Sequence, residues 1–214
     1  MIDLHTHTIL SDGELIASEL VRRAEVSGYK AICIADHCDW SNIDFIVPRI
    51  VKVSESLNKN WKIRVIPGVE LTHVPLQEIE PLVKFSRDHG AKIVIMHGET
   101  LSEPVIKGTN KRGIECGVDI LAHPGAITEE DARLALEKDV YLELSTRKNH
   151  TSANGHIVDV ARLTGAKMVL NTDAHSPDDL LTEETARHIL SQAGLSRTEM
   201  EEVFRNSEKI LNSL

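Results

Sequence analysis

The chain has 214 residues, 41% of them apolar, so it is long enough to bury one substantial core, and a single domain over residues 1–214 is expected. Its formal net charge of -9 at pH 7 disfavours broad binding to a nucleic-acid backbone, although a small anionic substrate is not excluded. No apolar run approaches the roughly 20 residues that span a bilayer, and the charged start at Asp3 does not resemble a secretory leader, so we expect a cytoplasmic protein without a membrane partner.

Short apolar runs rich in Ile and Val alternate along the chain with amphipathic helical patterns. The predicted strands are Ile2–Leu4, Ala31–Ala35, Ile63–Val69, Lys92–Met96, Val118–Ala122, Val140–Leu144 and Lys167–Asn171. The predicted helices are Gly13–Ser27, Ile43–Leu57, Pro75–His89, Asn110–Cys116, Thr128–Lys138, Asn154–Thr164, Pro177–Gln192 and Ser196–Ser207. This alternation requires right-handed crossovers and a parallel sheet, which is either open or closed into a barrel.

Most of the predicted strands end on a residue type that can hold a metal ion. In chain order these residues are His5 with His7, His37, Glu70, His97, His123, and Asp173 with His175. An open sheet gathers ligands mainly near one switch point, whereas a barrel brings all of its strand ends around one axis. The distribution of ligand types over so many strands therefore favours a closed barrel.

Histidine is over-represented, with 11 copies in a chain that has only 3% aromatic residues. His5 and His7 are two residues apart on a strand, so their side chains share one face and can grip one ion, although such a pair alone can also be a packed, hydrogen-bonded pair. Asp12, in a Ser11-Asp12-Gly13 turn, is either a ligand or a turn or helix-cap residue, and we favour a ligand. Asp36 projects away from His37 on an extended chain, so we expect it to support the ligands through hydrogen bonds.

Taken together and in order, these motifs resemble the polymerase and histidinol phosphatase (PHP) superfamily. They are His5-x-His7 with Asp12, Ala35-Asp36-His37, Gly68-Val69-Glu70, Met96-His97-Gly98, Ala122-His123-Pro124 and Asp173-x-His175. The resemblance spans essentially the whole chain. It implies a distorted seven-stranded (β/α)7 barrel, similar to a TIM barrel, that holds two to three divalent ions.

The resemblance also implies how the ligands are shared. His5, His7, Glu70 and Asp173 would bind one ion; Glu70, His97 and His123 a second; and Asp12, His37 and His175 a third. Some relatives carry histidine where this chain has Asp12, so the third position is richer in oxygen here. It should either favour Mn or Fe over Zn or be only partly filled.

The residue types agree with this assignment. Imidazole and carboxylate ligands without thiolates suit Zn, Mn or Fe, and a carboxylate such as Glu70 can bridge two ions. A water between two ions becomes acidic enough to supply a hydroxide nucleophile near neutral pH. Because the sequence has neither a Gly-x-Ser-x-Gly elbow nor a P-loop, a covalent serine route is not expected. The three cysteines should be reduced thiols.

Four residues are candidates for binding the substrate. Arg147 is predicted to hold phosphate oxygens through its planar guanidinium, with Lys148 and Arg112 as weaker candidates, and each of the three can instead be a solvated loop or helix charge. His73 can donate a proton to the leaving group or can be an ordinary loop histidine.

The leading hypothesis is a metal-dependent phosphoesterase that hydrolyses a small phosphomonoester, a phosphorylated metabolite such as histidinol phosphate. Two alternatives stay open. One is a phosphodiesterase or exonuclease-like hydrolase of the same superfamily, because related barrels in polymerases trim DNA ends. The other is a non-catalytic RNA-binding subunit of similar fold, although the acidic charge and the full set of ligand residues make nucleic acid an unlikely partner.

Overall fold

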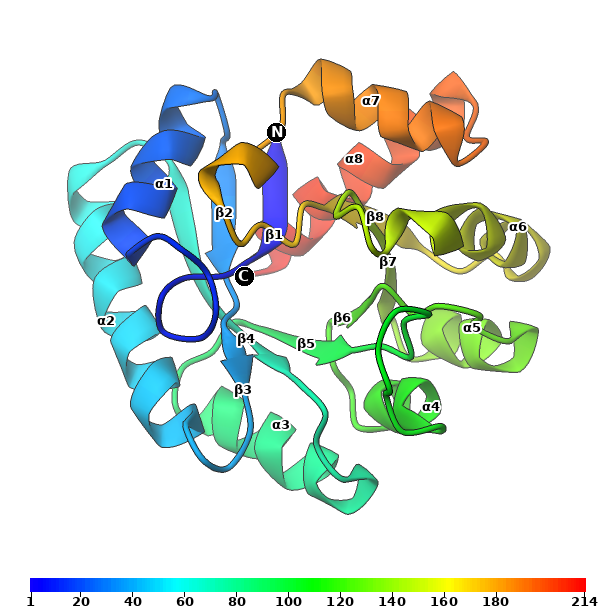
Figure 1. Cartoon of the computed structure of the whole chain (residues 1–214), viewed down its shortest axis with the longest axis horizontal. Coiled ribbons are helices and arrows are strands. Elements are labelled where there is room, and N and C mark those ends of the chain that lie inside the picture. The colour runs from blue at the N-terminus through cyan, green and yellow to red at the C-terminus, as the bar shows by residue number, and fades with distance from the viewer.

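The computed structural model describes all of residues 1–214 as strands alternating with helices, as the apolar pattern predicts (Figure 1). The strands are β1 Ile2–Thr6, β2 Ala31–Ile34, β3 His37–Cys38, β4 Arg64–Leu71, β5 Ile93–His97, β6 Ile120–Ala122, β7 Tyr141–Ser145 and β8 Met168–Asn171. The helices are α1 Ala17–Val26, α2 Ile43–Asn60, α3 Ile79–Asp88, α4 Thr109–Glu115, α5 Glu129–Glu137, α6 Asn154–Thr164, α7 Glu183–Gln192 and α8 Arg197–Ser213. None of the helices is both long and apolar enough to cross a membrane.

All paired strands run parallel, in the order β1-β2-β4-β5-β6-β7-β8, and helices surround the sheet (Figure 1). The two-residue strand β3 continues the line of β2 and pairs with the end of β4. The result is a nearly closed (β/α)7 barrel, and the predicted fold class is confirmed. All carboxyl ends of the strands therefore lie at one rim.

The barrel closes between β1 and β8 through irregular contacts instead of a regular ladder. The amide of Leu4 donates to Asn171 Oδ1 at 2.9 Å, and the Thr172 hydroxyl donates to the carboxylate of Asp3 at 2.6 Å. Nearer the rim, the amide of His7 donates to the carbonyl of Ala174 at 2.9 Å. This seam fixes the first histidines of the chain against the residues that follow β8.

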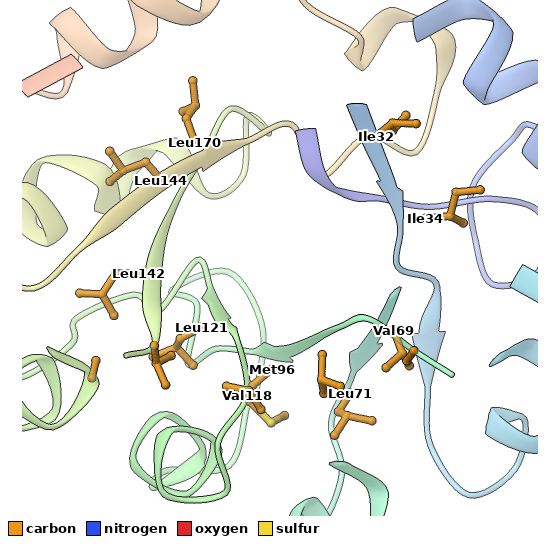
Figure 2. Close-up of a cluster of buried hydrophobic side chains, with 14 of the residues drawn as sticks. Ile32, Ile34, Val69, Leu71, Met96, Val118, Leu121, Leu142, Leu144 and Leu170 are labelled. Carbon is orange, nitrogen blue, oxygen red and sulfur yellow. The ribbon is translucent and has the colours of Figure 1, made fainter. Parts of the chain in front are cut away.

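Apolar side chains fill two separate layers. The larger layer lies between the strands and the helices; Figure 2 shows several of its members, such as Ile34, Leu71 and Leu142, projecting outward from the ring of strands. A smaller cluster lies inside the barrel and includes Ile93, Ile95 and, from α8, Ile210. Both faces of each strand are therefore buried, as expected for parallel sheets covered by helices.

Two predictions about local structure were wrong. The pattern over Pro177–Gln192 is not one helix: a 3-10 turn at Pro177–Asp179 ends at Leu180, which is extended, and α7 starts afresh after the N-cap Thr182. The carboxylate of Asp179 accepts from the amide of Ser176 at 2.7 Å. This capping contact stabilises the short turn as a separate element. The predicted helix Gly13–Ser27 begins only at Ala17, because residues 8–16 form the loop that carries Asp12.

Candidate metal centre

The carboxyl ends of the strands bring the predicted ligands into one cluster. They come from β1 and its following loop (His5, His7, Asp12), β3 (His37), β4 (Glu70), β5 (His97), the turn after β6 (His123) and the segment after β8 (Asp173, His175). All of these side chains are nearly or fully buried except His37, which is partly exposed, and Asp12, which is exposed. The polar side chains are therefore concentrated at one end of an otherwise apolar barrel.

The first group contains His5, His7 and Asp173. The Nε2 atoms of the two histidines lie 3.0 Å apart, and His7 Nε2 lies 3.1 Å from Asp173 Oδ1. Glu70 reaches the same group, with its Oε2 atom 3.4 Å from His5 Nε2. The structure thus brings together the four residues that the superfamily resemblance assigns to one ion.

Glu70 is at the centre of the cluster. Its Oε1 atom lies 3.6 Å from His123 Nε2, and its Oε2 atom lies 2.6 Å from His37 Nδ1. Glu70, His97 and His123 also have ligand atoms within reach of one common ion. One fully buried carboxylate therefore contacts side chains of all three predicted ligand groups.

The third group lies nearest the solvent. Asp12 Oδ1 is 3.2 Å from His175 Nε2 and 3.5 Å from His37 Nε2, and these three residues can share an ion with His7. The loop that carries Asp12 is held by Asp36, whose carboxylate accepts from the amide of Thr8 and from the hydroxyl of Ser11 at 2.7 and 2.6 Å. Asp36 thus supports the ligand loop through hydrogen bonds, as its position predicts.

The protonation of the histidines indicates that cations belong in this cluster. His5 Nδ1 contacts Glu143 Oε2 at 2.8 Å, and His175 Nδ1 contacts the carbonyl of Asp173 at 2.8 Å, so each Nδ1 atom carries the proton. In a neutral imidazole the Nε2 atom then presents a lone pair. That of His5 faces Glu70 Oε2 at 3.4 Å, and that of His175 faces Asp12 Oδ1 at 3.2 Å, with Arg147 Nη1 also 3.1 Å away. Glu70 Oε1 and Asp173 Oδ1 are buried without any hydrogen-bond partner. Lone pairs that face one another in a buried space fit divalent ions.

The electrostatics of the site agree with this fit. Burial opposes ionisation of Glu70, but the surrounding histidines, above all His5 and His37, hold the pKa of its carboxyl well below the usual value. Burial, together with the neighbouring His37, lowers the pKa of His7 to about 3, so this imidazole is neutral. Burial opposes charge on His5 and His37, but the surrounding carboxylates, above all Glu143 for His5 and Glu70 for His37, raise the pKa of each ring. A metal ion that binds these imidazoles would therefore displace a proton from them. Carboxylates and imidazoles together form a donor set that suits Zn, Mn and Fe.

The backbone is strained where it presents several of these side chains. His73, His123 and Asp173 have φ angles of 53°, 29° and 52°, in the left-handed region that residues other than glycine rarely adopt. Such conformations persist only where surrounding contacts enforce them, and they are concentrated at functional sites. The amide of Asp173, for example, donates to the carbonyl of His5 at 3.0 Å across the barrel seam.

The structure separates the four predicted substrate residues. Arg147 lies beside the cluster, with Nη1 3.1 Å from His175 Nε2 and 3.4 Å from Asp173 Oδ2. His73 lies at the edge of the cluster, its ring centroid 5.0 Å from that of His97. Lys148 is exposed and forms no ion pair. Arg112 is paired with Glu80 at 2.7 Å on the helical surface, so the structure does not bring it to the cluster.

Three residues of the cluster were not predicted as ligands or supports. Glu143, fully buried on β7, accepts from His5 Nδ1 and from Asn171 Nδ2 at 2.8 Å each. His150 lies beyond β7, with Nε2 3.6 Å from Asp173 Oδ2. Glu103, in the loop between β5 and α4, contacts His97 at 3.2 Å. Of these, only His150 gave a sequence signal, as a histidine placed beyond a strand end.

Comparison with known sequences points to one family. A family model named PHP domain matches residues 3–100. An uncharacterized protein of Methanocaldococcus jannaschii is 45% identical over 211 residues, which cover 98% of this chain and 97% of that protein. The DNA polymerase/3'-5' exonuclease PolX of Bacillus subtilis is 26% identical over 207 residues, covering 86% of this chain but only 36% of PolX.

Comparison with solved structures supports the same fold. A chain in an archaeal ribonuclease P bound to mature tRNA superimposes with a TM-score of 0.76 and 18% identity, covering 100% of this chain and 90% of that one. The histidinol phosphate phosphatase of Lactococcus lactis, complexed with zinc, L-histidinol and phosphate, superimposes with a TM-score of 0.63 and 18% identity, covering 91% and 94%. At these identities the likeness concerns the fold alone.

Proposed function

The chain belongs to the PHP superfamily, and from that premise we propose that it is a metal-dependent phosphoesterase that hydrolyses a small phosphomonoester, with histidinol phosphate as one candidate substrate. One observation carries this proposal: carboxylates and imidazoles from the ends of six strands meet in a buried cluster, with Arg147 beside it. Clustered ligands of this kind serve hydrolysis in two-metal sites.

Two or three divalent ions would be held by His5, His7, Asp12, His37, Glu70, His97, His123, Asp173 and His175. Ions bound there would lower the pKa of a water and neutralise charge on the phosphoryl oxygens. Glu143 assists by fixing the Nδ1–H tautomer of His5, which keeps the Nε2 lone pair directed into the site.

Arg147 is assigned to phosphate binding. Its guanidinium is about one-third exposed, so it can reach a ligand while it remains next to Asp173. A planar guanidinium forms two parallel hydrogen bonds with phosphate oxygens, which orients the phosphoryl group and stabilises the charge that it carries during transfer.

His73 is assigned to the leaving group. Its Nε2 atom lies 3.1 Å from Glu103 Oε2, and this contact places the ring at the edge of the cluster. A protonated imidazole at the edge of the cluster can supply a proton to the departing alkoxide.

The proposal is tested with the purified protein and a panel of phosphorylated alcohols that includes histidinol phosphate. We expect phosphate release that stops when a chelator removes the ions and returns when Mn²⁺ or Zn²⁺ is added. Activity that persists in excess chelator would refute the proposal.

The sequence match to PolX favours one alternative, hydrolysis of a phosphodiester. The matched segment is about a third of PolX, and the net charge of -9 disfavours a long polyanion as substrate. Rates on a monoester, a diester and a single-stranded oligonucleotide, measured at the same ion concentration, separate the two reactions. A faster rate on the diester would replace our assignment.

The fold match to a chain of ribonuclease P favours a second alternative, a non-catalytic RNA-binding role. RNA binding without base-specific contacts depends on cationic surface and weakens steeply with salt. Salt-sensitive RNA affinity in a protein that binds no metal ions would support this role and overturn the phosphoesterase.

A further inference from the structure

Glu103 lies in the loop between β5 and α4, which is folded back onto the candidate metal centre. The base of the loop is held by Glu99, whose carboxylate accepts from the amides of Gly108 and Asn110 at 2.9 and 3.0 Å. Next to Glu99, the hydroxyl of Thr100 lies 2.7 Å from His150 Nδ1. Both ends of the loop that carries Glu103 are therefore anchored beside the cluster.

The carboxylate of Glu103 contacts only histidines among the charged side chains around it. Its Oε2 atom lies 3.1 Å from His73 Nε2 and 3.2 Å from His97 Nε2, and its Oε1 atom lies 3.9 Å from His150 Nε2. No lysine or arginine pairs with it. A carboxylate that is 36% exposed yet turned toward three imidazoles has a role in the site and not in solvation.

The tautomer of His97 makes this contact informative. His97 Nδ1 lies 3.2 Å from the carbonyl of Gly98, which can only accept, so Nδ1 carries the proton. The other ring nitrogen, Nε2, faces Glu103 Oε2 at 3.2 Å. A contact this short between two atoms that each carry a lone pair needs a cation between them, which is either a proton on Nε2 or a metal ion.

His97 belongs to two groups of possible ligands, one with Glu70 and His123 and one with His73 and Glu103. Because His97 has a single free nitrogen, it can bind only one ion, and that ion can take further ligands from either group. Ligand atoms bound at about 2.0–2.2 Å to a tetrahedral ion are about 3.3 Å apart, close to the observed contact.

We propose that Glu103 is a further carboxylate ligand of the ion that His97 binds with Glu70 and His123. This inference rests on the proposed metal centre. It adds a ligand from outside the motifs that define the superfamily resemblance. The ion bound by His97 would then have four protein ligands. Because Glu103 lies on a loop, ion binding should also order residues 100–107.

Metal affinity of the intact protein tests this proposal without any activity measurement. Titration calorimetry with Mn²⁺ and with Zn²⁺ is compared for the wild type and for Glu103→Gln, which keeps size but removes the charge. Because the loss of supporting contacts alone weakens metal binding by about 10–100-fold, we expect one ion to bind at least tenfold more weakly in the variant, with the others unchanged.

The control is Glu78→Gln. Glu78 is a half-buried carboxylate in the connection between β4 and α3 and accepts from Trp40 Nε1 at 2.7 Å. Its substitution removes the same charge without touching a histidine. We expect wild-type affinities for this variant. Equal losses in Glu78→Gln and Glu103→Gln would show a general charge effect and overturn the assignment of Glu103.

Hydrogen exchange provides a second readout that is independent of affinity. Adding Mn²⁺ should slow amide exchange over residues 100–107 in the wild type and should leave it unchanged in Glu103→Gln. Slowing of the same size in both proteins, or wild-type ion affinities in Glu103→Gln, would contradict the proposal. A wild-type protein that binds no ions at all would instead refute the metal centre itself, so the two failures are distinguishable.

Discussion

The two ends of the barrel interior use the same strands for opposite purposes. On β5, the first two inward-facing residues, Ile93 and Ile95, pack in the inner apolar cluster, and the third, His97, is in the polar cluster. On β4, Ile66 is in the apolar cluster and Glu70, four residues later, is at the centre of the candidate site.

This difference separates what stabilises the fold from what serves chemistry. The amino-terminal end is closed by apolar contacts that include Ile210 of α8. The carboxyl rim has buried polar atoms without partners and strained backbone at His123 and Asp173, all of which are unfavourable in a protein without ions. Substitutions at the two ends should therefore have different consequences.

The largest effect is expected for Glu70→Gln. Because Glu70 contacts side chains of all three ligand groups, its loss should reduce ion binding and lower kcat/KM by more than about 10²-fold, beyond the loss typical of a supporting contact. The melting temperature of the ion-free protein should also fall, because the lowered pKa of Glu70 means that its ionised carboxylate stabilises the folded state through the neighbouring histidines. Calorimetric melting and metal analysis of the purified variant measure both quantities. A variant with near-normal metal content would show that Glu70 is not needed for ion binding at the carboxyl rim.

A loss of stability without a loss of ion binding is expected at the amino-terminal end for Ile93→Ala. Ile93 is fully buried, so its truncation should lower the free energy of unfolding by about 2–5 kcal/mol. Ion affinity should stay within a few-fold of the wild type below the melting temperature. Leu163→Ala on α6, at a side chain that is 65% exposed, is the control and should change stability little. Denaturant titration measures the differences.

The arrangement of the ligands could be predicted from sequence because parallel strands impose it. A residue that ends a buried apolar run lies at the carboxyl rim, so His97 or Glu70 can be placed before any contact is known. Loop and helix residues have no such constraint. Arg112 follows β5 in sequence, but its position on α4 directs it to Glu80, and Glu103 reaches the cluster through loop hydrogen bonds that sequence does not reveal. Glu143 lies inside the mostly apolar strand β7 and not at its end, so its position in the sequence does not mark it as a site residue.

A smaller effect is expected for Arg147, which touches the site without belonging to the ligand set. A hydrogen bond to a charged group contributes about 1.5–3 kcal/mol, so Arg147→Ala should lower kcat/KM about 10- to 100-fold. Arg147→Lys keeps the charge but loses the planar pair of donors, so it should recover only part of the rate. Ion affinity should not fall in either variant. Steady-state kinetics on the best substrate measures kcat/KM of both variants. A wild-type kcat/KM in Arg147→Ala would show that Arg147 does not bind the phosphate.

The smallest effect is expected for Arg112→Ala and Lys148→Ala. Arg112 forms surface ion pairs with Glu80 and Glu115, which contribute no more than about 1 kcal/mol, and Lys148 is exposed. Both variants should retain wild-type kcat/KM. A tenfold rise in KM for either one would show that the substrate extends beyond the rim, over the loops that carry these residues.

The central claim is that divalent ions bind among the strand-end side chains, and anomalous diffraction from crystals soaked in Mn²⁺ or Zn²⁺ tests it most directly. We predict two or three anomalous peaks within about 2.0–2.3 Å of ligand atoms, with Glu70 next to at least one of them. Crystals that show anomalous peaks only on the outer surface, with none among His7, Glu70, His123 and Asp173, would contradict the account.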